Sequence, residues 1–168
     1  MSEKKKLYKL TEKDGQTYGG TQWGEGIKHT APGTGVLCKE GWLHAYEHPL
    51  LAVLLNPIHA CFKKPRLWEA EGTVGISDSL KVGCTELITV KEIPLPEISR
   101  EQKVYFAILC AQKVYSEGKW LKWAENWLKR EDRSAHAAAD AAAYAAHAAH
   151  AADNKINFAS LAEKACSS

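Results

Sequence analysis

The uneven distribution of glycine, proline and alanine constrains the fold of this chain more than any other feature. Residues 7–98 hold all but one of the twelve glycines and all six prolines. These residue types mark turns and interrupt regular elements, so this part predicts short strands and turns. Residues 99–168 consist almost throughout of helix formers. The sequence therefore predicts an α+β fold, in which a small mixed or antiparallel sheet domain is followed by a C-terminal helical bundle with an alanine-rich helix.

The first part contains four segments with strand character and one short helix. Strands are expected over residues 7–10, 42–46, 66–71 and 85–93, the last two because their apolar residues alternate with period two. A helix over 50–55 is expected to open at His48-Pro49, because proline fits a first turn, and to be closed by Asn56-Pro57.

The boundary falls in the connector Ile93-Pro-Leu-Pro96. Ser99 and Gln102 have the spacing of a capping box, which predicts a helix with an apolar stripe through Val104 and Ile108. The division is thus an α+β module over residues 1–95 and a helical region over 96–168, packed together as one compact unit. Further helices are expected around Trp120, Trp123 and Trp127, after possible caps at Asp132 and Ser134, and from Asn157 onward.

The third expected helix is unusual because thirteen of the eighteen residues from 135 to 152 are alanine. The exceptions His136, Asp140, Tyr144 and His147 share one face, with His150 at its edge. This stripe keeps the helix soluble, faces a ligand or, least favoured by its spacing, holds a metal. The thin alanine face also predicts a homodimer.

The charge balance and the cysteines exclude several classes of protein. With 22 basic and 20 acidic residues the net charge of +2 gives no strong nucleic-acid signal. The basic start Met1–Lys6 precedes no apolar stretch of the kind that a signal peptide needs, and no run is long enough to span a membrane. Five scattered cysteines are then expected to be reduced thiols, in a cytoplasmic protein without a cofactor.

The segment from Gly33 to Gly72 mixes glycines, tryptophans, histidines and paired glutamates, as ligand-binding surfaces do. Zinc could be bound by cysteine and histidine side chains, but the spacing of the candidates is irregular: Cys38, His44, His48, His59 and Cys61. The sequence signal for a Cys–His nucleophile is equally weak. The glutamates Glu69 and Glu71 share one strand face, which is either exposed and solvated or used for base or ribose-binding chemistry. Trp23, Trp42 and Trp68 either pack in the core or stack a base.

The candidate ligand-binding residues, collected from both parts of the chain, are Trp23, Trp42, His44, Tyr46, Arg66, Glu69, Glu71, His136, Asp140, Tyr144 and His147. If the protein is an enzyme, His44 and Glu71 are its base or orienting groups. No metal site is expected.

The block Cys38-Lys-Glu-Gly-Trp-Leu-His44, followed by Pro49 and by the strand Arg66–Gly72, resembles an uncharacterised module of bacterial and phage proteins, with one extra residue before His44. The similarity covers residues 7–95. The tryptophan-rich and alanine-rich helices resemble those of immunity proteins and of phage proteins of unknown role. His44-Ala-Tyr46 and Glu69-Ala-Glu71 also distantly resemble elements of ADP-ribosyltransferase-like folds.

The first two resemblances imply a phage or mobile-element origin but no biochemical activity. The dense polar and aromatic block, which contains no assembled catalytic set, favours a binding protein that sequesters a nucleotide-derived signal and so counteracts a host defence, in the host cytoplasm. The alternatives are a nucleotide-processing enzyme and a protein-binding inhibitor or immunity protein, whose partner would be a host defence protein.

Overall fold

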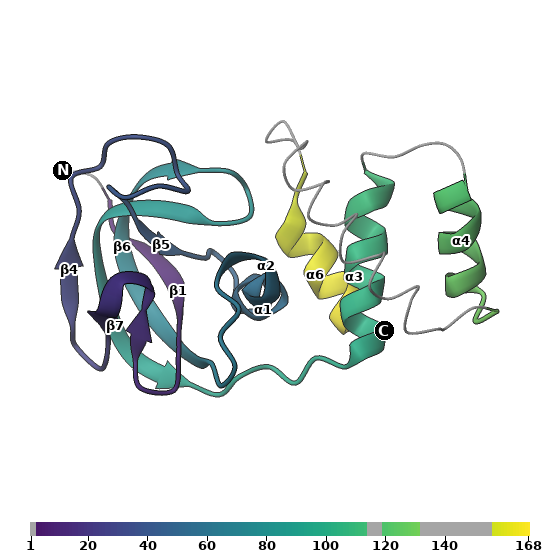
Figure 1. Cartoon of the computed structure of the whole chain (residues 1–168), viewed down its shortest axis with the longest axis horizontal. Coiled ribbons are helices and arrows are strands. Elements are labelled where there is room, and N and C mark those ends of the chain that lie inside the picture. The colour runs from purple at the N-terminus through teal and green to yellow at the C-terminus, as the bar shows by residue number, and fades with distance from the viewer. Residues whose placement is uncertain (1–2, 114–118, 132–155) are drawn as a thin grey trace. The chain divides into compact units, whose positions relative to one another are not determined.

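The computed structural model describes residues 3–113, 119–131 and 156–168. The chain divides into two compact units, Met1–Glu97 and Ile98–Ser168. The division lies two residues beyond the expected boundary, just after the proline-containing connector. The predicted α+β class is confirmed, with an antiparallel sheet in the first unit and helices in the second (Figure 1).

The sheet of the first unit is built around the long hairpin of β6 (Arg66–Ser77) and β7 (Val82–Ile93). Strand β1 (Lys5–Thr11) pairs with β6, while β4 (Lys28–Thr30) and β5 (Leu43–Ala45) pair with successive parts of β7. A separate hairpin joins β2 (Gln16–Thr17) to β3 (Thr21–Gln22) through the 3-10 turn η1 (Tyr18–Gly20).

The sheet closes on itself through the backbone of two tyrosines. Tyr8 of β1 and Tyr46, directly after β5, exchange two N–H···O bonds of 2.8 Å. The path β1–β6–β7–β5 therefore returns to β1 and forms a small barrel, in which β1 has no open edge at this point. The strands curl around this barrel in Figure 1.

The barrel interior is filled by residues that alternate along the strands. Leu7, Ala45, Ala70, Val82, Cys84 and Leu87 form one buried cluster with Trp23. Since side chains two apart on a strand share a face, Lys9 and Thr11 follow Leu7 on the inner face of β1. Both are buried, and the Thr11 hydroxyl accepts a hydrogen bond of 3.0 Å from Nε1 of Trp68. A lysine in this position is the unusual feature of the barrel.

In the first unit the expected end of the 66–71 strand was wrong, and the expected helix is followed directly by a second one. Strand β6 runs on to Ser77, past Gly72, where a Cβ would lie 2.8 Å from the Glu86 carbonyl oxygen. Glycine is needed here because the paired strands approach closely. Helix α1 (Pro49–Leu54) ends before Asn56-Pro57, but these residues open a second helix, α2 (Asn56–His59), because a first turn needs no N–H from proline.

The second unit contains three described helices: α3 (Arg100–Gln112), α4 (Lys119–Leu128) and α6 (Phe158–Cys166). The capping box is confirmed, since Ser99 Oγ accepts from the Gln102 amide at 3.1 Å and Gln102 Oε1 from the Ser99 amide at 2.9 Å. The predicted stripe of α3 is buried against Ala124 and Trp127 of α4. Gln102 Nε2 also donates to the Cys166 carbonyl of α6, which lies beside α3 in Figure 1.

The alanine-rich segment lies outside the described residues, together with its stripe of His136, Asp140, Tyr144, His147 and His150 and the expected caps Asp132 and Ser134. Its ligand-facing, solvated and dimerising interpretations stay predictions. No helix in the described part of the chain is long and apolar enough to cross a membrane.

Candidate functional site

A pocket of about 850 Å³ opens in the first unit. It is lined by Lys9 of β1, by Thr17, Tyr18, Thr21 and Trp23 around the β2–β3 hairpin, and by residues 30–32 and 38–44. Its volume lies within the range of roughly 300–1,000 Å³ that is usual for small-molecule sites. Much of one wall comes from the glycine-rich and histidine-rich segment that the sequence singled out.

Lys9 brings a buried amine to this pocket. Only 8% of the residue is exposed, and Nζ donates a 2.6 Å hydrogen bond to the His44 carbonyl oxygen. The same Nζ lies 4.9 Å from the centre of the Trp23 ring, within cation–π distance. In the part of the chain that the structure describes, no carboxylate pairs with it. The amine therefore lies at a ligand-sized pocket without an ionic partner.

Burial lowers the pKa of Lys9 from 10.5 to about 8. Desolvation is the largest cause, because a low-dielectric interior disfavours the charged ammonium, and the nearby Cys84 thiol opposes it. The same electrostatic coupling acts on Cys84, but desolvation dominates there and raises the thiol pKa to about 11. At pH 7 the site therefore holds an ammonium and a neutral thiol.

The indole of Trp23 forms the apolar side of the amine site. The residue is 2% exposed, and its Nε1 donates to Thr17 Oγ1 at 3.0 Å. The His29 ring packs edge-on against it at 4.6 Å between ring centres. Trp23 is thus both a core residue and part of the pocket wall, so the two interpretations of this tryptophan are compatible.

Residues 31–42 form a loop between β4 and β5, and three of the hydrogen bonds that hold it in place lie beside the pocket. The Gly33 amide donates to the Gly41 carbonyl at 2.8 Å, and Trp42 Nε1 donates to the Gly35 carbonyl at 3.0 Å. The third contact joins His44 Nε2 to the carbonyl oxygen of Leu37, whose side chain is buried. These bonds hold the loop as one wall of the pocket.

The hydrogen bond of His44 determines which of its ring nitrogens carries a proton. Because a carbonyl only accepts, Nε2 carries the proton and donates it to Leu37. Desolvation lowers the pKa of His44, and the charges of Lys81 and Lys9 lower it further against the opposing effect of the Leu37 bond. His44 is therefore a neutral residue that positions the loop.

Trp42 is half-buried over the β6–β7 hairpin. A Cβ on Gly75 would lie 2.5 Å from Cζ3 of the Trp42 ring, so β6 accommodates the indole only where it has no side chain. This glycine in the strand interior marks a close approach of the loop to the sheet. It fixes where the aromatic side of the pocket lies.

The predicted site residues are only partly brought together. Trp23, Trp42 and His44 line the pocket, whereas Tyr46, Arg66, Glu69 and Glu71 are not among its lining residues. Tyr46 is buried and its hydroxyl hydrogen-bonds Nδ1 of His59 at 2.9 Å. Burial raises the pKa of Tyr46 well above its ordinary value of 10.

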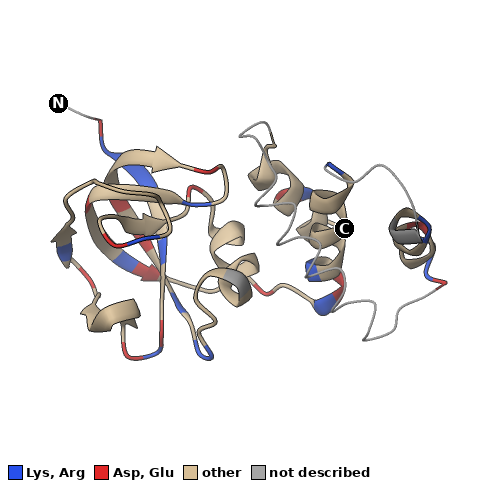
Figure 2. Cartoon of the chain, turned by 45° about the horizontal axis from the view of Figure 1, so that its top comes forward, with Lys and Arg blue, Asp and Glu red and all other residues tan. Residues whose placement is uncertain are grey.

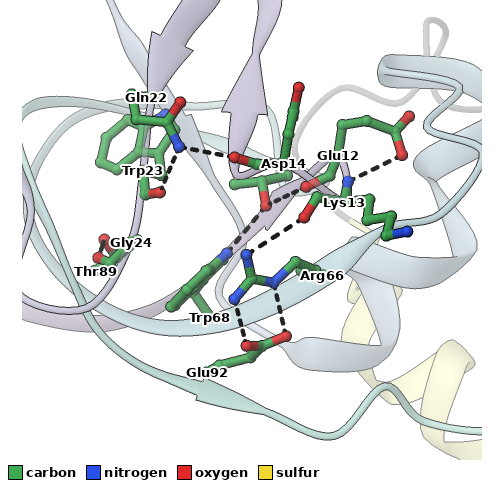
Figure 3. Close-up of polar contacts among 11 residues, drawn as sticks. Glu12, Lys13, Asp14, Gln22, Trp23, Gly24, Arg66, Trp68, Thr89 and Glu92 are labelled. Atoms are coloured by element: carbon green, nitrogen blue, oxygen red, sulfur yellow. Dashed lines mark hydrogen bonds and ion pairs between the residues drawn. The ribbon is translucent and has the colours of Figure 1, made fainter.

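Arg66 faces a carboxylate of the neighbouring strand. Its Nη2 and Nε atoms bind Glu92 at 2.6 and 2.9 Å, its guanidinium lies over the Trp68 ring, and Nη1 reaches the Lys13 carbonyl (Figure 3). The ion pair raises the pKa of Arg66 and lowers that of Glu92. The charge of Arg66 is thus already paired within the sheet.

Glu69 and Glu71 belong to a network of opposite charges on the outer sheet surface. Glu69 lies 2.9 Å from Lys6 and 3.6 Å from Lys91, and these lysines, above all Lys6, lower its pKa. Glu71 is exposed opposite Lys6 in the β1–β6 register. Figure 2 shows basic and acidic residues interleaved on these strands. The structure thus fits the interpretation that Glu69 and Glu71 face solvent better than the one in which they face inward.

The cysteines and histidines weighed as zinc ligands do not gather. Among the residues that the structure describes, no group of three or more histidine, cysteine, aspartate or glutamate side chains could hold a metal ion. Cys38 is exposed at the pocket, but the nearby His44 ring binds the Leu37 carbonyl and not a thiol. The Cys–His pair expected of a nucleophile is therefore not formed here.

Sequence reasoning missed Lys9 and Tyr18 as pocket residues. The signal for Lys9 was its place two residues after Leu7 in a predicted strand, which puts it on the buried face. Tyr18 is 94% exposed beside Gly19-Gly20, and such an aromatic at a pocket mouth has no signature in a single sequence.

A smaller pocket of about 290 Å³ lies in the second unit, lined mainly by the first turn of α3 and the end of α4. Because the larger pocket also contains a buried amine, it is the better candidate.

Comparison with known proteins gave no match: no protein family, no curated protein and no solved structure is significantly similar to this chain. The function must therefore be argued from the pocket itself.

Proposed function

We propose that the first unit binds a small anionic ligand with a flat ring, of the nucleotide class, in the pocket of Lys9, Trp23 and Trp42. One observation carries the proposal: Lys9 presents a buried ammonium at a pocket of about 850 Å³, with no carboxylate partner among the described residues. A buried charge is costly unless it is paired. An anionic ligand would supply the missing partner, and the ligand's binding would regain part of that cost.

The aromatic residues that line the pocket are the evidence that the ligand contains a flat ring. Trp23 and Trp42 both line the pocket, and Tyr18 lies exposed at its mouth. Aromatic side chains stack on nucleobases whatever the base, with roughly 1–3 kcal/mol per base lost on alanine substitution in single-strand-binding proteins. A phosphate near Lys9 and a base near the indoles would use both kinds of surface at once.

A binding role is favoured over catalysis by the positions of the two residues named for an enzyme. His44 lines the pocket, but its Nε2 is held by the Leu37 carbonyl, and Glu71 is exposed on the outer face of β6. General acid–base chemistry needs such groups within hydrogen-bond reach of one substrate. We therefore propose sequestration of the ligand rather than its turnover.

The resemblance to a phage module supports a biological setting for this binding. A protein that sequesters a nucleotide-derived signal in the host cytoplasm would counteract a defence system that depends on that signal. Mass spectrometry of small molecules that co-purify with the native protein would identify the ligand. Recovery of a host protein in place of any small molecule would favour the inhibitor alternative.

Calorimetry with a panel of nucleoside monophosphates, cyclic nucleotides and ADP-ribose tests the proposal. Wild type should bind at least one member, and Lys9→Met should weaken that binding by roughly 30-fold or more, because loss of a buried charge partner costs about 2–5 kcal/mol. Lys9→Arg should retain more affinity than Lys9→Met. Lys91→Met, an exposed lysine of the same sheet, is the matched control and should bind as wild type does.

The absence of heat with every panel member would remove the nucleotide proposal. Equal binding by wild type and Lys9→Met would show that Lys9 is not the anion site.

A further inference from the structure

Lys9 differs from the other lysines of the sheet in its surroundings. Lys4 and Lys6 lie on the surface and contact Glu86 and Glu69 at 2.8 and 2.9 Å, and these carboxylates raise the pKa of both lysines. Lys9 is buried and borders the pocket, and its contacts within the described residues are with a carbonyl oxygen and an indole, near the Cys84 thiol. The surface lysines at this end of the sheet are thus paired with carboxylates, whereas Lys9 has no carboxylate partner in the part of the chain that the structure describes.

We propose that Lys9 is a carbonyl-capturing residue, whose amine condenses with the aldehyde group of an anionic aromatic ligand in the pocket to form a reversible imine. This inference rests on the proposed function for the place of the ligand, and it adds a covalent step and an aldehyde to the ligand's chemistry.

The reaction needs no other reagent. The lone pair of the neutral Nζ attacks the carbonyl carbon, the C–N bond forms, and the carbonyl π electrons move to oxygen. A proton passes from nitrogen to oxygen to give the carbinolamine, which loses its hydroxyl group and the second amine proton as water. One amine and one aldehyde thus give one imine and one water, without oxidation or reduction.

The contacts of Nζ suit each stage of this step. The His44 carbonyl, 2.6 Å away, holds the nitrogen at the pocket and can accept the N–H of a protonated imine. The Trp23 ring, 4.9 Å from Nζ, stabilises the positive charge of that imine. Burial lowers the pKa of Lys9 to about 8, so the amine is mostly charged at neutral pH but its neutral, nucleophilic form is far more populated than in an ordinary lysine.

In the non-covalent complex of the proposed function, the Lys9 ammonium is itself the partner of the anion. In the covalent complex the attacking amine is neutral, so the ligand's anionic group needs a second cation. Lys39 lines the same pocket from the exposed part of the loop. A phosphate or carboxylate at Lys39 and an aldehyde at Lys9 define the ligand class: a flat molecule that carries both groups.

The test uses the full chain and pyridoxal 5′-phosphate, a flat, phosphorylated aldehyde, as the probe. The protein is exposed briefly at pH 7.5, reduced with borohydride to fix any imine, digested, and mapped by mass spectrometry. We expect Lys9 to be labelled at least tenfold faster than Lys91, the internal control in the same molecule. The Lys9 rate should rise with pH about a midpoint near 8. Pyridoxine 5′-phosphate, which lacks the aldehyde, should slow labelling of Lys9 by occupying the pocket.

Labelling of Lys9 no faster than that of Lys91 in the folded wild-type protein would overturn the inference. This outcome is independent of whether a variant folds. Nucleotide binding that still depends on Lys9 would then leave the proposed function standing, whereas the loss of both would remove both. Lys9→Arg, which keeps a charge but cannot form the imine, should show no label at position 9 while its circular dichroism matches wild type.

Discussion

At the residue scale, Lys9 lowers the stability of the barrel and at the same time offers a charged group for ligand binding. Its place on the inner face of β1, between Leu7 and Thr11, would suit an apolar side chain. The amine instead keeps its charge at neutral pH, at a free-energy cost set by desolvation. A residue that destabilises the fold and borders a pocket is the kind of local inconsistency that functional sites show.

Lys9→Met should stabilise the protein at pH 7. The folded-state pKa of Lys9, about 8, lies below the 10.5 of an unperturbed lysine, so below pH 8 the folded state carries the whole cost. At roughly 1.4 kcal/mol per pKa unit, the gain is at most about 3 kcal/mol. Between pH 8 and 10.5 the unfolded state binds more protons, wild-type stability rises, and the advantage of the variant should shrink.

Urea unfolding of wild type and Lys9→Met at pH 7 and pH 10 measures this difference. Comparing the two proteins cancels the titration of the other groups. A stability difference that does not change with pH would contradict a lowered pKa of Lys9.

The sequence predicted three pocket residues, Trp23, Trp42 and His44, because a dense aromatic and histidine block is uncommon in a plain core. It could not separate them from Arg66 and Glu69, since pairing with Glu92 or with Lys6 depends on strand register. A single-residue shift in register would move these side chains to the other face. The sequence thus indicated which residues could bind a ligand, but it could not predict which residue pairs with which.

At the element scale, the loop over residues 31–42 depends on the sheet beneath it. Gly75→Ala should disturb this contact, because the new Cβ would lie 2.5 Å from Trp42 Cζ3. Overpacking of this kind costs about 1–3 kcal/mol, and the partly exposed ring can relieve some of it by moving. We expect a shift in tryptophan fluorescence and weaker ligand binding.

A double-mutant cycle isolates this contact. In a Trp42→Leu background, Gly75→Ala should cost clearly less stability than in wild type, since the ring is gone. Equal costs in both backgrounds would mean that Gly75 is required for another reason.

Helix α3 depends on its capping box. Ser99→Ala should cost about 1 kcal/mol, because the Gln102 amide loses the Ser99 hydroxyl that satisfies it at 3.1 Å. Ser160→Ala, in the first turn of α6, is the matched control and should be neutral or slightly stabilising. Chemical denaturation followed by far-UV circular dichroism compares them. An equal effect of the two substitutions on the free energy of unfolding would mean that the Ser99 cap does not stabilise α3.

Elements with a local signature were the most predictable. The Ser99–Gln102 box and the Asn157 start of α6 were expected where they occur, and the period-two run over 85–93 lies within β7, which begins three residues earlier, at Val82. These signals could be read because capping and alternation act within a few residues. The bridge between Tyr8 and Tyr46 was not predictable, since it joins residues far apart in the chain and uses only their backbone atoms.

At the scale of the whole molecule, the pocket belongs entirely to one unit. All its lining residues fall between positions 9 and 44, inside Met1–Glu97. Residues 1–97 expressed alone should therefore unfold cooperatively and bind any ligand of the full chain with similar affinity. Calorimetry on both forms measures this. A folded fragment that has lost the ligand would mean that residues 98–168 contribute to the site.

Lys9 places an amine without a carboxylate partner among the described residues at a ligand-sized pocket, and NMR titration of this side chain measures the consequence. We expect a pKa of about 8 for Lys9 in the free protein and a rise of this pKa when a nucleotide from the panel binds. The Lys9 side-chain signal is assigned as the one that is missing from the spectrum of Lys9→Arg. An anion near the ammonium must favour its charged form. A pKa near 10.5 in the free protein, or no change on binding of the ligand, would contradict the account.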